Sequence, residues 1–240
     1  MPLAVEALRA SYGDALVLDG LSLGVARGQV TALVGPNGSG KSTLLKAMAR
    51  LLRPSGGAVL LDGSAIARLP TAQGRYPHAG PLRMLRRQDH AAIAEALELT
   101  GMLAFADRSL DALSGGERQR AWIALALALA QATPILLLDE PTTFLDIGRQ
   151  LEILTLVRRL NRERALTVVL VLHDLNQAAR YADTMVVLDR GRIAAHGEPR
   201  DVLTVRLLES VFGVHAHILT DPATGTPLCV PYAVVAPDNE

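Results

Sequence analysis

The stretch from Val30 to Leu52 constrains the fold more than any other part of this sequence. It reads VTALV, then GPNGSGKST, then LLKAMARLL: a short apolar run, a glycine-rich loop, and apolar residues at helical spacing. This order predicts a buried strand, a tight loop and a helix. Further strand and helix patterns alternate along the chain, which predicts an α/β fold with a mostly parallel sheet. Ligands of such sheets bind at the carboxyl ends of the strands.

The remaining patterns predict the other elements of this fold. Antiparallel strands are expected at 3–13 and 16–29, and further strands at 58–63, 134–141 and 166–174. Helices are expected at 90–103, 115–132, 148–163 and 199–213, and a hairpin at 184–199. Residues 215–240 show little pattern and are expected to form a C-terminal tail. We expect a single domain over 1–240, with a helical subdomain at about 78–132.

Charge and composition argue against two classes of protein. The 24 basic and 24 acidic residues balance, and no stripe of basic residues is interleaved with aromatics, so a nucleic-acid partner is not expected. Residues 121–138 lack charge and approach the length of a membrane span. However, Pro134 interrupts them and Asp139 follows at once, which favours a buried helix followed by a buried strand.

Cys229 is the only cysteine, which favours a reducing cytosol.

The glycine-rich loop has the residues that bind a phosphate chain. Its glycines allow successive backbone N–H groups to turn inward around a phosphate, and the following helix adds the partial positive charge of its amino terminus. Lys41 is expected to reach the β- and γ-phosphates, and Ser42 to offer its hydroxyl to Mg²⁺. The candidate binding residues are Gly35, Pro36, Asn37, Gly38, Ser39, Gly40, Lys41, Ser42 and Thr43.

Two acids follow the apolar run ILLL about a hundred residues later. Adjacent carboxylates at the end of a buried strand are costly unless a cation is near. Asp139 is therefore expected to hold Mg²⁺, directly or through water, and Glu140 to polarise the attacking water. A simple turn at the end of a strand would also accept these residues, but the phosphate-binding loop favours the catalytic interpretation.

The run LSGGERQR, residues 113–120, places Ser114, Gly115 and Gly116 at the start of a helix. This is a second anion-binding arrangement, for which a single chain has no obvious use, although an ordinary helix cap would also begin with Ser. Together with the loop and the two acids, this run resembles the signature of the ATP-binding cassette family. The resemblance covers nearly the whole chain. It implies a P-loop NTPase fold with an antiparallel β subdomain and a helical subdomain.

The resemblance also implies roles for other residues. The run TFLD, ending at Asp146, is similar to the family's D-loop, and His173 to its switch histidine, which steadies the γ-phosphate with Lys41. Tyr12 is similar to the aromatic residue that stacks on adenine. The resemblance implies a head-to-tail homodimer that binds two ATP molecules with Mg²⁺. In that dimer, Ser114 and Gly116 of one subunit would face the phosphate loop of the other.

A closer resemblance indicates a substrate class. The runs QRAWIALALA, ILLLDEPTTFLD, VLHDLNQAARYAD and GTPLCVP are similar to the ATPase subunits of bacterial importers for ferric siderophores, with haem and cobalamin importers as near relatives. This implies ATP hydrolysis at the cytoplasmic face of the plasma membrane. The direct partner would be a pair of transmembrane permease subunits, and a periplasmic or surface substrate-binding protein would act indirectly.

One expected part of such a protein is missing. The family carries a strand ending in a glutamine, the Q-loop, between the phosphate loop and the signature. Here Lys41 and Ser114 are only 73 positions apart, and no second apolar strand precedes RYPHAG. We infer an internal deletion that shortens the helical subdomain, with Gln73 as a possible substitute for the lost glutamine. The alternative function is therefore a weakly active or inactive nucleotide-binding module that no longer couples to transport.

Overall fold

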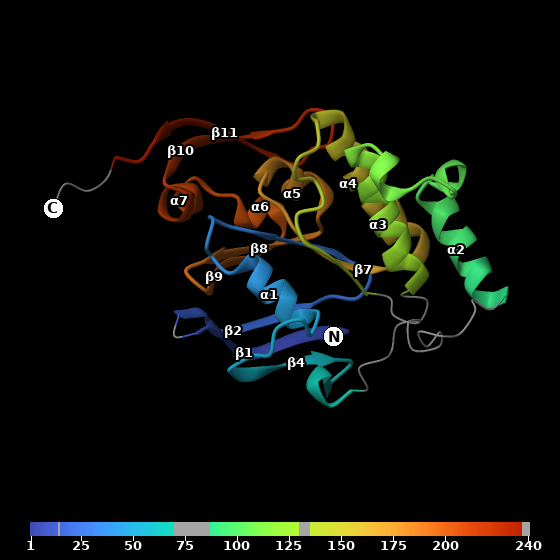
Figure 1. Ribbon diagram of the computed structural model, residues 1–240. Coiled ribbons are helices and arrows are strands. Elements are labelled where there is room, and N and C mark those ends of the chain that lie inside the picture. Colours follow the sequence, from blue (N-terminus) through green and yellow to red (C-terminus); the bar gives the residue numbers. More distant parts are fainter. Residues whose placement is uncertain (14, 70–86, 130–134, 237–240) are drawn as a thin grey trace.

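A five-stranded sheet with the order β6-β7-β3-β8-β9 forms the centre of the fold (Figure 1). The computed structural model describes residues 1–13, 15–69, 87–129 and 135–236. The first four strands of the sheet are parallel and β9 is antiparallel to β8, which confirms the predicted mostly parallel sheet. The strands are β3 (Val30–Val34), β6 (Ile135–Leu138), β7 (Thr167–Val171), β8 (Thr184–Asp189) and β9 (Arg192–Gly197).

The sheet is covered on both faces, so its strands are apolar at nearly every position. In β8, Met185 and Val187 pack into the core on one face, and Val186 and Leu188 pack into the core on the other. All four side chains are fully buried. Burying an aliphatic side chain contributes about 1.5–3 kcal/mol. These continuous apolar runs follow from burial of both faces of the sheet.

Helices and a second sheet cover the two faces (Figure 1). On one face lie α1 (Lys41–Met48) and a four-stranded antiparallel sheet of order β2-β1-β4-β5. Its strands are β1 (Leu3–Tyr12), β2 (Ala15–Val25), β4 (Gly56–Leu61) and β5 (Ser64–Ala65). On the other face lie α4 (Ile147–Arg164), α5 (Leu175–Tyr181) and α6 (Pro199–Val202). Helices α2 (Arg87–Leu99) and α3 (Gly115–Leu129) pack on each other at one side.

Strand β6 is an edge strand in the described part of the chain, since only β7 pairs with it there. Leu136 and Leu138 are buried against the helices, whereas Ile135 and Leu137, which point to the opposite face, are only half-buried. The strand proposed to be deleted would precede the signature in sequence. Residues 70–86, which include Gln73, lie outside the described residues. The open edge of β6 is what the loss of a neighbouring strand would leave.

The uncharged run 121–138 is divided between two elements. Helix α3 occupies its first part and β6 its last, on either side of residues 130–134, which are outside the described part. Among the described helices, none combines the length and apolar character that a bilayer span requires.

The prediction of a patternless C-terminal tail is wrong. Residues after 213 form an antiparallel hairpin of β10 (Val214–Thr220) and β11 (Pro227–Val234). The alternation is hard to see because many side chains on both strands are exposed and Pro227 and Pro231 interrupt β11. Asp221 organises the turn by accepting hydrogen bonds from the Ala223 N–H and the Thr224 hydroxyl. This Asx-type turn is the signal that could have indicated a hairpin.

Two predicted helices end earlier than expected. The helix predicted at 90–103 ends at Leu99, because Gly101 takes a left-handed φ of 68° that terminates the helix. The helix predicted at 199–213 is broken into α6, α7 (Val205–Leu207) and a π turn, Leu208–Phe212. The break occurs at Thr204, whose hydroxyl caps α7 by accepting a hydrogen bond from the Leu207 N–H.

Asp183 links three elements of the core. It accepts a hydrogen bond from the Val30 N–H at 2.8 Å, and its two oxygens receive the guanidinium of Arg158 at 2.6 and 2.7 Å. Burial would raise the pKa of Asp183, but the hydrogen bonds from Arg158 and Val30 outweigh it and hold this pKa below its ordinary value. The carboxylate therefore stabilises the fold above about pH 4, and this contribution is lost as the pH falls through the lowered pKa.

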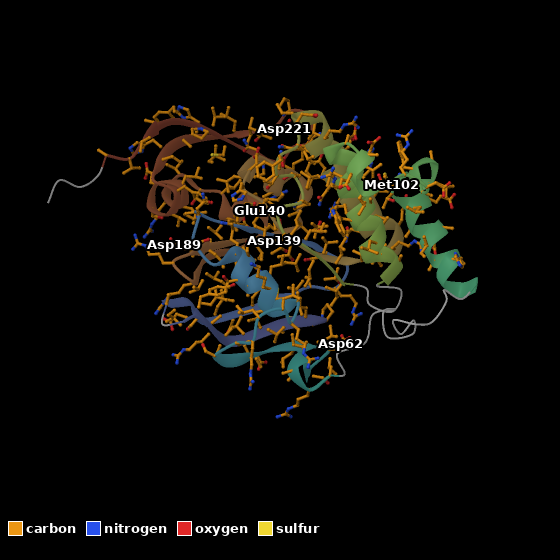
Figure 2. The ribbon with its side chains drawn as sticks, viewed as in Figure 1. Asp62, Met102, Asp139, Glu140, Asp189 and Asp221 are labelled. Carbon is orange, nitrogen blue, oxygen red and sulfur yellow. The ribbon has the colours of Figure 1, made fainter. Side chains whose placement is uncertain are left out.

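Replacing Asp183 by Asn is expected to lower the free energy of unfolding at pH 7 by about 2–3 kcal/mol, because charge-assisted hydrogen bonds are lost. Urea denaturation measures this change. The matched control is Asp62→Asn, which removes an exposed pair with Arg27 and should cost less than about 1 kcal/mol. Asp62 lies at the lower edge of Figure 2. Equal decreases in the free energy of unfolding in the two variants would contradict the stabilising role assigned to Asp183.

Candidate nucleotide site

A cavity of about 280 Å³ lies where the phosphate loop meets the ends of β6 and β7. Figure 2 marks Asp139 and Glu140 near the centre of the molecule, directly after β6. The loop, Glu140 and His173 are far apart in sequence, and the fold brings them to one edge of the sheet. The lining residues are Val17, Asn37, Gly38, Gly40, Lys41, Ser42, Thr43, Glu140 and His173.

The loop needs glycine at two positions for steric reasons. Gly35 has a φ of 144°, and a Cβ there would lie 2.1 Å from the carbonyl oxygen of Leu188. Gly40 has a φ of 102°, and a Cβ there would lie 2.6 Å from a methyl group of Leu18. Side chains at either position would push the loop away from the sheet. The loop is thus held close to β8 and β2 in a conformation that only glycine adopts at low cost.

Helix α1 begins without the kind of side-chain cap that α4 and α5 have. Asp146 caps α4 and Asp174 caps α5, each by accepting backbone N–H groups of the first turn. In contrast, α1 begins at Gly40 with no side-chain cap and no acidic residue in its first turn. Its first N–H groups therefore remain available, together with the positive end of the helix dipole. Such a helix start is suited to an anionic ligand.

Lys41 is almost fully buried and folds back onto the loop. Its Nζ donates hydrogen bonds to the carbonyl oxygens of Gly35 at 2.9 Å and Pro36 at 2.8 Å. Burial lowers the pKa of Lys41, while the charges of Glu140 and Asp139 oppose this change. The ammonium group is thus positioned beside the loop without a direct partner of opposite charge in the described structure. An incoming phosphate would supply that partner.

Ser42 and Asp139 fit the ligands of a magnesium ion. The Ser42 hydroxyl donates to Oδ1 of Asp139 at 3.0 Å, which brings two oxygen donors together at the mouth of the loop. The described residues contain no group of three acidic, histidine or cysteine side chains that could hold a metal alone. Mg²⁺ commonly uses one or two protein oxygens and completes its shell with phosphate oxygens and water. The donor set therefore fits Mg²⁺ bound together with a nucleotide.

Glu140 is held at both carboxylate oxygens. Oε1 lies 2.7 Å from Nε2 of His173, and Oε2 accepts a hydrogen bond from the Thr143 hydroxyl at 3.1 Å. Its backbone has a φ of 49°, in the left-handed region that non-glycine residues rarely adopt. Such strain is common at functional sites. Thr143 was not predicted as a site residue, although it lies in the same run as the two acids.

Other predicted site residues lie outside this cavity. The Ser114 N–H donates to Oε2 of Glu117 and the Glu117 N–H donates to the Ser114 hydroxyl, so these residues form a capping box at the start of α3. Gly115 is exposed and Gly116 is buried beside them. Tyr12 ends β1 and is half-exposed. The single chain does not bring these residues, or Asp146, into the cavity.

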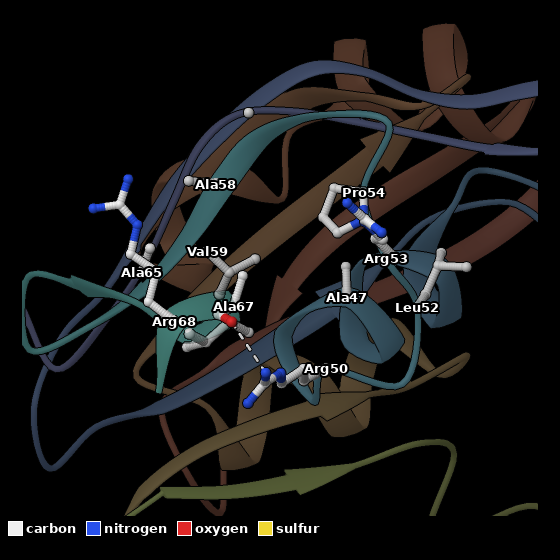
Figure 3. A pocket seen from close by; sticks show the side chains of 12 residues that line it. Ala47, Arg50, Leu52, Arg53, Pro54, Ala58, Val59, Ala65, Ala67 and Arg68 are labelled. Carbon is white, nitrogen blue, oxygen red and sulfur yellow. Dashed lines mark hydrogen bonds between the residues drawn. The ribbon is translucent and has the colours of Figure 1, made fainter. Parts of the chain in front are cut away.

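A larger cavity, of about 720 Å³, lies elsewhere (Figure 3). It is bounded by the end of α1, by β4, and by the short turn Ile66–Arg68. Arg50 crosses it and donates hydrogen bonds to the carbonyl oxygens of Ala67 and Leu69. None of the predicted site residues lines this cavity. Cavity size therefore does not identify the chemical site in this molecule.

Comparison with known proteins identifies what the chain is similar to. The sequence profile of the ABC transporter family matches residues 18–143. The iron(3+)-hydroxamate import ATP-binding protein FhuC of Bacillus subtilis (strain 168) is 42% identical, over 99% of this chain and 97% of FhuC. The ferric enterobactin transport ATP-binding protein FepC of Escherichia coli (strain K12) is 43% identical, over 98% of this chain and 95% of FepC.

Solved structures share the fold. An ABC transporter in an inward-facing conformation matches with a TM-score of 0.82 and 27% identity, over 96% of this chain and 97% of that chain. The ABC transporter cassette MJ0796, solved as a dimer, matches with a TM-score of 0.67 and 27% identity, over 82% of this chain and 99% of that chain. A second dimeric structure of MJ0796, in a post-hydrolysis state, contains ADP and Pi.

The alignments also show a difference in length. The alignment with FhuC spans 264 positions but includes 99% of the 240 residues here, about 238, so about 26 positions hold no residue of this chain. The alignment with FepC spans 260 positions and includes 98% of the chain, about 235 residues, which leaves about 25 such positions. Both relatives therefore contain roughly 25 additional residues within the aligned region.

Proposed function

This chain belongs to the ABC transporter family of ATP-binding proteins, which are ATPases, and we propose that it energises a bacterial importer of ferric siderophores. The convergence of Lys41, Glu140 and His173 on one cavity carries the ATPase part of the proposal. Identity of 42–43% to FhuC and FepC over almost the whole chain supports the siderophore cargo. The direct partners would be transmembrane permease subunits at the cytoplasmic face of the plasma membrane, with a binding protein acting indirectly.

The proposal assigns roles to residues that line the cavity and to two, Tyr12 and Asp139, that do not line it. Lys41 and the free N–H groups of α1 bind the phosphates, and Tyr12 stacks on the adenine. Ser42 and Asp139 would hold Mg²⁺, which when bound neutralises phosphate charge. Glu140 positions and polarises the attacking water, because its carboxylate lies at the cavity wall. His173 binds the γ-phosphate and thereby leaves Glu140 free to contact the water.

The proposal includes a head-to-tail dimer. Ser114 is exposed at the start of α3, and the cavity of one chain lacks the signature residues that the family resemblance places beside ATP. A second copy would supply Ser114, Gly115, Gly116 and the Asp146 loop. The dimeric structures of MJ0796 support this arrangement. Each nucleotide would then be bound by two chains, which explains an anion-binding helix start with no ligand in its own subunit.

Ser114→Arg should prevent ATP-dependent dimerisation, because a bulky cation would fill the space between the subunits. We expect a Glu140→Gln protein in saturating Mg-ATP to run as a dimer in size-exclusion chromatography with light scattering. Addition of Ser114→Arg should keep it monomeric. The control Ser64→Arg, at an exposed position on β5 remote from α3, should leave the dimer intact. A dimer in the Ser114→Arg protein would contradict the arrangement.

A second candidate function is supported by the difference in length. The edge position of β6 among the described strands and the roughly 25 alignment positions without a residue of this chain agree with loss of the strand and Q-loop that join the core to the helical subdomain. Such a chain would bind nucleotide but couple poorly to a permease. The phosphate loop lies between β3 and α1, away from the edge at which the lost strand would have paired. Nucleotide binding should therefore survive better than coupled transport.

The experiment that separates the two functions measures hydrolysis and uptake together. The chain is reconstituted in proteoliposomes with permease subunits of a ferric hydroxamate importer, its binding protein and internal Mg-ATP. Uptake of ferric hydroxamate that depends on Glu140 supports the importer. Glu140-dependent hydrolysis without uptake supports the uncoupled module. Absence of both activities would refute the importer; an ATP titration of the same protein would then decide the second candidate, which retained ATP binding would support and absence of ATP binding would refute.

A further inference from the structure

The side chain of Asn176 is bound to the backbone of Cys229 by two hydrogen bonds. The Cys229 N–H donates to Oδ1 of Asn176 at 2.7 Å, and Nδ2 of Asn176 donates to the Cys229 carbonyl oxygen at 3.1 Å. A primary amide that binds both groups of one residue mimics a neighbouring strand. We call this pair of hydrogen bonds the Asn176 clasp. It joins residues 53 positions apart in the sequence.

Asn176 lies close to the switch histidine. Helix α5 begins directly after His173, with Asp174 as its N-cap. Oδ1 of Asp174 accepts hydrogen bonds from the N–H groups of Asn176 at 2.8 Å and Gln177 at 3.0 Å. Asn176 is thus in the first helical turn, three positions after His173. A displacement of this turn would move the histidine relative to Glu140.

Among the described residues, the clasp is one of two side-chain hydrogen-bonded attachments of the C-terminal hairpin. The hairpin pairs only within itself in the described structure and lies over α5 and α7 (Figure 1). Ala216 and Cys229 bury their side chains against Leu208. At the other side, Nδ1 of His215 lies 2.7 Å from Oε1 of Glu209. The Glu209 contact joins the hairpin to the π turn, whereas the clasp joins it to the helix that follows His173.

The same helical turn is also tied to the D-loop. Nε2 of Gln177 donates to Oε1 of Gln150 at 2.6 Å, and Nε2 of Gln150 donates to the Leu145 carbonyl oxygen at 2.9 Å. The first turn of α5 is therefore held from two directions, by the hairpin through Asn176 and by the D-loop through Gln177. Each tie consists of directional hydrogen bonds, so the turn has little freedom to rotate.

We propose that Asn176 is a positioning residue for the ATPase, and that its clasp makes the C-terminal hairpin part of the mechanism that orients His173. The proposal rests on the proposed function, because it assumes that His173 contacts the γ-phosphate. The hairpin fixes the clasp, the clasp fixes the first turn of α5, and this turn fixes the direction of His173. Asn176 itself does not line the nucleotide cavity. Loss of the clasp should therefore impair turnover more than nucleotide binding.

The test compares Asn176→Ala, Asn176→Asp and Glu209→Gln with the wild-type chain. Asn176→Ala removes both hydrogen bonds, and Asn176→Asp keeps the acceptor for the Cys229 N–H. Glu209→Gln weakens the other attachment of the hairpin and leaves the clasp intact. For each protein, kcat and KM for Mg-ATP are measured, together with the Kd of a fluorescent ATP analogue. Hydrogen exchange at Cys229 shows whether the clasp is present.

We expect Asn176→Ala to lower kcat by between about 2-fold and 30-fold, the usual effect of a residue that acts on a site without contacting its ligand. KM and Kd should change by less than about twofold. Asn176→Asp should show a smaller loss of kcat, and Glu209→Gln should show no loss of kcat. A kcat within twofold of wild type in Asn176→Ala, once exchange shows that the clasp is lost, would overturn the proposal. So would an equal loss of kcat in Glu209→Gln, or a loss confined to KM.

Two further outcomes are decisive. If Asn176→Ala does not fold, Asn176→Asp carries the comparison, because it removes the hydrogen bond to the Cys229 carbonyl oxygen, and a wild-type kcat in this variant overturns the proposal. If the wild-type chain hydrolyses no ATP, the proposed ATPase function fails and the positioning role fails with it. If wild type is active and only the variants behave unexpectedly, the proposed function stands and the role of Asn176 does not.

Discussion

Replacing Glu140 by Gln should reduce steady-state ATP hydrolysis by about 10²- to 10⁴-fold, the usual cost of removing a general base, while ATP still binds. The amide has almost the same shape as the carboxylate but cannot accept a proton from water. The hydrogen bond from Thr143 can be kept, since one oxygen remains. ATP binding should be retained because the proposed contacts of the phosphates are with the loop and α1. Phosphate release and the Kd of a fluorescent ATP analogue measure the two effects.

The matched control is Glu198→Gln, which makes the same chemical change at an exposed carboxylate paired with Arg200. Its hydrolysis rate should equal that of wild type. A Glu140→Gln protein that retains more than about a tenth of wild-type turnover would show that another group activates the water. Loss of ATP binding along with turnover would instead indicate that Glu140 has a structural role in the loop.

Replacing Lys41 by Met should weaken ATP binding by at least about 30-fold, because loss of one partner of a buried charge pair costs about 2–5 kcal/mol. Met retains the length and apolar stem of the side chain. The variant loses the ammonium group that now binds the carbonyl oxygens of Gly35 and Pro36. Isothermal titration with ATP in the presence of Mg²⁺ measures the change.

Lys46 provides a matched control for this measurement. Lys41 and Lys46 are the only lysines in the sequence, and both lie on α1. Lys46 is exposed in the last turn, away from the loop. Lys46→Met should therefore bind ATP as wild type does. Equal affinity of Lys41→Met and Lys46→Met would contradict the assignment of the loop as the phosphate site.

The fold and the cavity were predictable where a short run of residues contains the whole signal. The phosphate loop lies between a strand and a helix within one continuous stretch, so its glycines, Lys41 and Ser42 could be identified together. Asp139 and Glu140 follow a buried strand, and parallel strands place their carboxyl ends at the same edge. This geometry brought Glu140 and His173 to the loop as expected.

Contacts that depend on an unusual backbone conformation or on a distant segment were not predictable from local patterns. The contact of the Thr143 hydroxyl with Glu140 depends on the left-handed backbone of Glu140, which gives no sequence signal in a non-glycine residue. The Asn176 clasp depends on a hairpin whose alternation is obscured by exposed side chains and prolines. Ser114 caps its own helix by accepting a hydrogen bond from the Glu117 N–H, and it also matches the signature of the family. The sequence alone did not separate these two interpretations.

The edge position of β6 affects how stably Asp139 and Glu140 are held. Of the described strands, only β7 pairs with β6. Asp139 and Glu140 directly follow the last residue of β6. Edge strands with few buried neighbours open locally at lower free energy than the strands between them. The two carboxylates are therefore coupled to the strand that we expect to open first while the rest of the core remains folded. Thermal inactivation of this chain should then precede its global unfolding.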